Sequence, residues 1–154
     1  MFKIRDIEID TNTAEGKILF GNYYEQKLNN YLKNNSKYNY EMVSNTDIFS
    51  LYDFIALEGD KKRIIELRSR IGKIENYKYE IFHIEKFKRL INLFDKPEII
   101  EILLIFAHIN PDNYKDYKFY YIDIKDLEPN KLKINTKFNK EMYQIPTNLL
   151  KELE

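Results

Sequence analysis

The sequence predicts a single α/β domain in which a mixed central β-sheet is flanked by helices. Two segments, 14–34 and 80–94, carry apolar residues at helical spacing, and strand-like segments lie before, between and after them. Elements in this order build one sheet covered by helices. No repeat or linker interrupts the 154 residues, a length that suits one core, so we treat residues 1–154 as one domain.

The first half of the chain predicts one helix and four strands. The run Thr11–Glu15 holds a capping residue followed by an acid, which is typical of a helix start. Gly59-Asp60 separates two apolar, strand-like segments and favours a tight turn. In chain order we expect a strand over 2–9, a helix over about 14–34, strands over 38–44 and 51–58, and a return strand over 62–69.

The second half predicts a second helix, two strands and a tail without a regular pattern. The run 99–107 is apolar except for Glu101, which is typical of a buried strand, and Asn110-Pro111-Asp112 indicates a turn after it. In chain order we expect a helix over 80–94, strands over 99–107 and 117–124, an irregular tail from Leu127, and a short terminal helix opening at Pro146-Thr147.

The composition excludes several classes of protein and site. The 25 Lys and Arg residues balance the 25 Asp and Glu residues, which argues against a strongly basic, non-specific nucleic-acid binder. The chain has no cysteine and only two histidines, so thiolate and His-rich zinc centres are excluded. A divalent ion would have to bind through carboxylate oxygens.

The sequence shows no signal for secretion or for a membrane. The N-terminal residues alternate between charged and apolar and lack the apolar core of a signal peptide. The longest apolar run, 99–107, is too short to span a bilayer. We therefore expect an intracellular protein with no membrane partner. Its size and its richness in Lys, Asn, Ile and Tyr would also fit a virus- or phage-encoded protein.

Three carboxylates stand where apolar residues are expected. Glu25 borders the apolar face of the first helix, while Asp53 and Glu66 interrupt otherwise apolar strands. If Gly59-Asp60 forms a two-residue turn, paired positions sum to 119, and Asp53 faces Glu66 with Arg68 on the same side of the sheet. Facing like charges are destabilising without a cation, a shared proton or solvent. An edge position with Arg68 or a lysine as partner would explain any one acid, but the three together favour a functional site.

These residues resemble the PD-(D/E)XK nuclease superfamily, which has the restriction-endonuclease-like fold. The resemblance is carried by Glu25 in the first helix, Asp53 in one strand, Glu66-Leu67-Arg68 in the next and Lys86 in the following helix. It covers most of residues 15–124 and implies that superfamily's αβββαβ core. The chain departs from the motif because Arg68 stands in the place of a lysine and Tyr52 in the place of a proline.

The resemblance implies an endonuclease that depends on Mg²⁺, with Mn²⁺ as a substitute. It implies that Asp53, Glu66 and the carbonyl of Leu67 bind the ion, and that Glu25 contributes directly or through water. Hard cations prefer oxygen ligands, and a bound ion lowers the pKa of water and neutralises charge on phosphate. The motif's lysine orients the attacking water, and here that role would fall to Arg68 or to Lys86.

Two functions are therefore open. The first is hydrolysis of phosphodiester bonds in nucleic acid, DNA rather than RNA, by a monomer or a homodimer. The second is a catalytically inactive nuclease-like protein that binds nucleic acid or has a structural role. Arg68 favours the second function, because arginine keeps its proton near neutral pH. The trio of Glu25, Asp53 and Glu66 favours the enzyme, because crowded carboxylates without a task only reduce stability.

Overall fold

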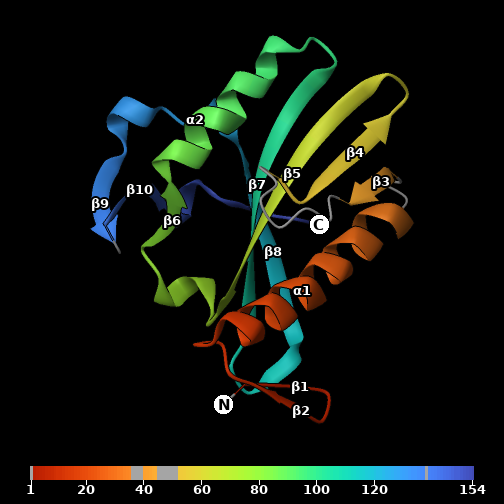
Figure 1. The fold of residues 1–154 in the computed structure, drawn as a ribbon, viewed down its shortest axis with the longest axis vertical. Helices are drawn as coiled ribbons and strands as arrows, with labels where there is room; N and C mark the ends of the chain where they lie inside the picture. The colour runs from red at the N-terminus through yellow and green to blue at the C-terminus, as the bar shows by residue number, and fades with distance from the viewer. Residues whose placement is uncertain (1, 36–39, 45–51, 138) are drawn as a thin grey trace.

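A six-stranded mixed sheet forms the centre of the protein (Figure 1). The structure, a computed structural model, describes residues 2–35, 40–44, 52–137 and 139–154. Strand β5 runs parallel to β7, and the other neighbouring strands are antiparallel. The predicted mixed α/β fold is confirmed. In sheet order, the strands are β11 (Lys151–Glu152), β8 (Asn113–Asp123), β7 (Ile99–Asn110), β5 (Lys61–Ile71), β4 (Phe54–Glu58) and β3 (Glu41–Ser44).

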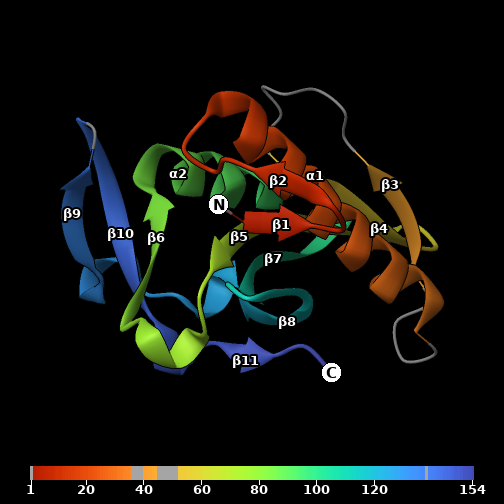
Figure 2. The same ribbon diagram turned by 90° about the horizontal axis from the view of Figure 1, so that it is seen from below.

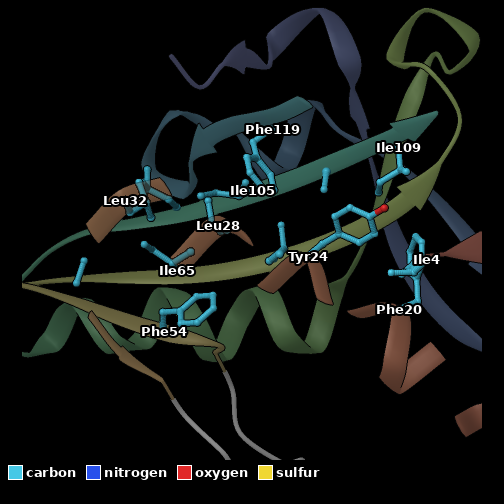
Figure 3. Close-up of a cluster of buried hydrophobic side chains, with 14 of the residues drawn as sticks. Ile4, Phe20, Tyr24, Leu28, Leu32, Phe54, Ile65, Ile105, Ile109 and Phe119 are labelled. Carbon is cyan, nitrogen blue, oxygen red and sulfur yellow. The ribbon is translucent and has the colours of Figure 1, made fainter. Parts of the chain in front are cut away.

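Helix α1 (Ala14–Asn34) covers one face of this sheet, and its bounds are those predicted. It begins where the sequence indicates, because the Thr13 side chain accepts a hydrogen bond from the backbone N–H of Gly16, 3.0 Å away. Its apolar stripe packs on the odd-numbered residues of β5 and β7. Figure 3 shows this cluster, which includes Tyr24, Leu28, Leu32, Ile65, Ile105 and Phe119.

The other face of the sheet packs against α2 (Ile84–Asn92) and a second, three-stranded sheet. This smaller sheet has the order β6-β10-β9 and stands at one side of the molecule beside α2 (Figure 2). Its strands are β6 (Tyr79–His83), β10 (Lys140–Pro146) and β9 (Lys133–Lys137). Its inward residues join the second core cluster, in which Phe82 and Ile145 are fully buried.

Several predicted elements differ from the structure. The predicted helix over 80–94 is wrong in its first turn, because residues 79–83 form β6 and the helix begins at Ile84. The tail after Leu127 is not irregular but contributes β9 and β10. The short helix predicted to open at Pro146-Thr147 is a single 3₁₀ turn over Thr147–Leu149, and β11 follows it. The predicted strand over 2–9 is a hairpin of β1 (Phe2–Ile4) and β2 (Ile7–Ile9), which turns where Arg5 has a φ of 57°.

Other boundaries agree more closely. The start of the strand predicted over 38–44 and the first residue of that predicted over 51–58 lie outside the described residues. The run 99–107 is a buried central strand, as predicted, flanked by β5 and β8. Short 3₁₀ turns connect the elements: η1 (Ile74–Asn76), η2 (Leu93–Asp95), η3 (Ile124–Asp126), η4 (Pro129–Lys131) and η5 (Thr147–Leu149). Neither α1 nor α2, the helices of the described chain, is long and apolar enough to cross a membrane.

Candidate active site

The turn between β4 and β5 determines which residues meet. Gly59 has a φ of 64°, the left-handed region that glycine adopts without Cβ strain. Glu58 therefore pairs with Lys61, and the ladder continues to Phe54 opposite Ile65, which is the register expected from the sequence. The ladder ends there. Asp53 lies one residue before β4, where its N–H donates to the carbonyl of Ile65 at 3.0 Å.

The carboxylate of Asp53 reaches past the end of β4 to the backbone of β5. Its Oδ2 accepts a hydrogen bond of 2.7 Å from the N–H of Leu67. The N–H and the carbonyl of one strand residue point toward the same neighbouring strand. The Leu67 carbonyl therefore points to the side of β5 on which Asp53 lies.

Glu66 is a buried acid between two cations. Its side chain projects toward α2, and its Oε1 forms an ion pair with Nζ of Lys86, from the first turn of that helix. Arg68, two residues further along the same face of β5, has its Nε 3.9 Å from the same oxygen. The other oxygen, Oε2, is buried and has no hydrogen-bond partner among the described residues.

Glu25 approaches this group from α1, on the opposite side of the sheet. The described ladder between β4 and β5 ends at Phe54 and Ile65, so it does not extend to Asp53 and Glu66. Burial is the main cause that raises the pKa of Glu25 to about 8, followed by the charge of Asp53 and a hydrogen bond to it, and then by the charge of Glu66. Burial, with the charge of Asp53, likewise raises the pKa of Glu66 to about 7, although Lys86 and Arg68 oppose it.

The fold thus brings together all five side chains that the sequence predicted for the site, and their roles stay predictions. They are Glu25, Asp53, Glu66, Arg68 and Lys86. Among the described residues, no three Asp, Glu or His side chains are grouped closely enough to hold one ion as they stand. The donor chemistry nevertheless suits Mg²⁺ or Mn²⁺. Glu25, Asp53, Glu66 and the Leu67 carbonyl offer only oxygens, one of them the buried oxygen of Glu66 that has no partner among the described residues. A cation would also offset the burial and the repulsion between carboxylates that together raise the two pKa values.

A second buried polar cluster lies further along the same face of β5, and sequence reasoning missed it. Glu80 of β6 accepts a hydrogen bond from Nη1 of Arg70 at 3.1 Å, and its other oxygen lies 2.5 Å from Nε2 of His108 in β7. His108 uses its Nδ1 for the carbonyl of Gly72, 3.0 Å away. Both Glu80 and His108 are only 4% exposed. The cluster therefore ties β6, which leads into α2 and Lys86, to β5 and β7.

Comparison with solved structures now gives the fold a wider context. The protein is similar to Hjc of Archaeoglobus fulgidus, a Holliday junction resolvase from an archaeal hyperthermophile, with a TM-score of 0.55 over 86% of this chain and 91% of that one. This chain has the restriction-endonuclease-like fold. The sequence identity is 17%, so the likeness is one of fold. No family model matches the sequence, and no curated protein is significantly similar to it.

Glu25, Asp53 and Glu66, here called the acid group, are positioned by the hairpin and the first helix of this fold. In the described structure, Asp53 and Glu66 come from the β4–β5 hairpin, and Glu25 and Lys86 come from the helices on either side of the sheet. The resemblance placed Glu25 and Lys86 in helices and Glu66 in a strand, where they lie, and Asp53 in a strand, whereas Asp53 lies one residue before β4. Arg68, which stands in the place of the motif's lysine, keeps a cation on the Glu66 side of β5.

Proposed function

We propose that the protein is a small metal-dependent nuclease that hydrolyses phosphodiester bonds in DNA. The observation that carries the proposal is the buried Oε2 of Glu66, which lacks a partner in the described structure and lies in a group with Asp53 and Glu25. A buried carboxylate oxygen without a partner is costly to stability. Its retention beside two further acids is explained if the group binds a cation during function.

The ligands of that cation would be Asp53, Glu66 and the carbonyl of Leu67, with Glu25 bound directly or through water. The ion, Mg²⁺ or Mn²⁺, would supply a lowered pKa for a bound water and would neutralise charge on the phosphate. Asp53 is oriented for this role by its hydrogen bond to the N–H of Leu67. Glu66 is held by the pairing of its other oxygen with Lys86, which leaves Oε2 available.

The two cations would divide the work of the motif's lysine. Lys86 touches Glu66 directly and is one-quarter exposed, so its compact ammonium can orient a water beside the acids. Arg68 is 45% exposed, and its planar guanidinium suits the grip of a phosphate. We assign substrate positioning to Arg68 and the orientation of water to Lys86.

The test is a cleavage assay on labelled DNA. The likeness to a Holliday junction resolvase makes a four-way DNA junction the first substrate, with duplex DNA, single-stranded DNA and RNA as comparisons. We expect cleavage of DNA with Mg²⁺ or Mn²⁺, none with EDTA, and none by Asp53→Asn or Glu66→Gln. Cleavage that persists in both variants would contradict the proposed site. Size-exclusion chromatography of the same sample tells whether two copies act together.

A catalytically inactive, DNA-binding protein is the second candidate. The observation that favours it is that Arg68 occupies the place of the motif's lysine while Lys86 already neutralises Glu66. An inactive wild type that gains cleavage in Arg68→Lys would support this candidate. Cleavage by the wild type would exclude it.

A further inference from the structure

The outer face of the β6–β10–β9 sheet, here called the outer face, carries an unusual set of charges. The strand registers place His83, Lys133, Lys137 and Lys140 on it, on the side away from the buried Phe82 and Tyr143. All residues of the three strands are described, and their two acids lie elsewhere: Glu80 is buried inward, and Glu141 points to the same side as Tyr143. The face thus has cations and no acid.

Two lysines of the outer face form no ion pair within the part of the chain that the structure describes. Lys137 and Lys140 stand directly opposite each other across the β9–β10 turn. Lys133 and Lys140 are exposed, and neither forms an ion pair with any residue that the structure describes.

One end of the outer face lies near Arg68 and Lys86 of the candidate site. Arg68 lies 5.6 Å from the ring of Phe82 in β6, and the next residue, His83, points outward and leads into α2 and Lys86. Burial lowers the pKa of His83, and the charges of Lys140, Arg68 and Lys86 lower it as well, whereas the charge of Glu85 raises it. His83, at the end of β6, therefore lies within electrostatic reach both of Lys140 on the outer face and of Arg68 and Lys86 at the candidate site.

We propose that the outer face binds the sugar–phosphate backbone of a DNA duplex that extends beyond the cleaved bond. This inference rests on the proposed function for the nature of the polyanion. Lys133 and Lys140 suit contacts to phosphates, because such contacts position a duplex without reading its sequence. The half-exposed Tyr79, Ile81 and Met142 between the cations give the duplex a flat surface on which to lie.

The test measures binding of a fluorescently labelled DNA duplex in EDTA, where no metal-dependent turnover occurs, over a range of salt concentrations. The test variant is Lys133→Ala/Lys140→Ala. The matched control is Lys17→Ala/Lys61→Ala, which removes two exposed lysines from α1 and from the β4–β5 hairpin, away from β9 and β10 in the fold (Figure 1). Both variants should keep the melting temperature of the wild type, because all four side chains are exposed.

We expect the test variant to bind more weakly and to lower the slope of log K against log salt concentration by about 2, because each lost phosphate contact removes ~0.9. The control should keep the slope of the wild type. If the two variants bind alike, the inference is overturned, even where the wild type cleaves DNA. If the slope falls in the test variant only, the outer face binds DNA, even where no cleavage is found and the nuclease proposal fails.

Discussion

Replacing Glu66 by glutamine should stabilise the protein at neutral and higher pH in metal-free buffer. Burial, the charge of Asp53 and the other effects on Glu66 raise its pKa from 4.5 to about 7. A carboxyl whose pKa is raised on folding binds its proton more tightly in the folded state, so stability is present at low pH and is lost as the pH rises from 4.5 to 7. Because each pH unit corresponds to ~1.4 kcal/mol, the full loss is on the order of 3 kcal/mol.

The assay is thermal or urea unfolding of wild type and Glu66→Gln between pH 4.5 and pH 8, in EDTA. Over this pH range, the free energy of unfolding of the wild type should fall more steeply than that of the variant. Its melting temperature should drop by roughly 10 °C relative to the variant, because a change of 1 kcal/mol shifts the melting temperature by about 2–4 °C. Glu141→Gln removes an exposed carboxylate from β10 and serves as the control, which should follow the wild type. Parallel curves for wild type and Glu66→Gln would refute the reasoning, because the buried charge would then cost nothing.

Three further predictions follow from the same contacts. Millimolar Mn²⁺ should raise the melting temperature of the wild type, since an ion at 100 times its Kd adds about 2.7 kcal/mol; Asp53→Ala should abolish the rise, and an unchanged rise would place the ion elsewhere. Arg68→Ala should lower the cleavage rate by ~10²-fold and DNA binding by less, whereas Arg68→Lys should keep or raise cleavage; a rate equal to that of the wild type in Arg68→Ala would reduce Arg68 to a neutralising partner. Glu80→Gln should lower the free energy of unfolding by about 3 kcal/mol, because it leaves Arg70 and His108 without their buried anion; chemical denaturation measures this, with the exposed Glu75→Gln as the control that should not change.

The parts of the site that follow from local sequence could be predicted. The capping residue before α1 and the glycine turn before β5 are short-range signals, and the turn sets which residues of two strands meet. The position of Asp53 beside Glu66 follows from that register alone. The structure differs from the prediction in one detail. Asp53 lies just before β4, and its carboxylate accepts a hydrogen bond from the N–H of Leu67 instead of pairing within the ladder.

The parts that depend on distant partners could not be predicted. Strand β6 resembled the start of a helix, because Ile81 continues the helical spacing of Ile84 and Phe87. Its strand conformation is stabilised by β10, whose flanking strand β9 is exposed throughout and shows no apolar alternation. The strands β6, β10 and β9 depend on one another, so the sequence did not predict this sheet.

The buried cluster was missed for the same reason. Glu80 is buried only because Arg70 and His108 come to it from β5 and β7, at sequence separations of 10 and 28 residues. No local pattern marks such a residue as buried, since glutamate is rarely buried without a partner. The partner becomes visible only in the folded structure.

The most direct test of the metal site is a crystal soaked in Mn²⁺, with data collected to locate manganese by its anomalous scattering. The account predicts a peak beside Glu66 and Leu67 of β5, bound by oxygens of Asp53 and Glu66 and by the carbonyl of Leu67, with Glu25 bound directly or through water. The same soak of Glu66→Gln crystals should lack the peak. A manganese peak elsewhere, or none beside Asp53 and Glu66 in the wild type, would contradict the account.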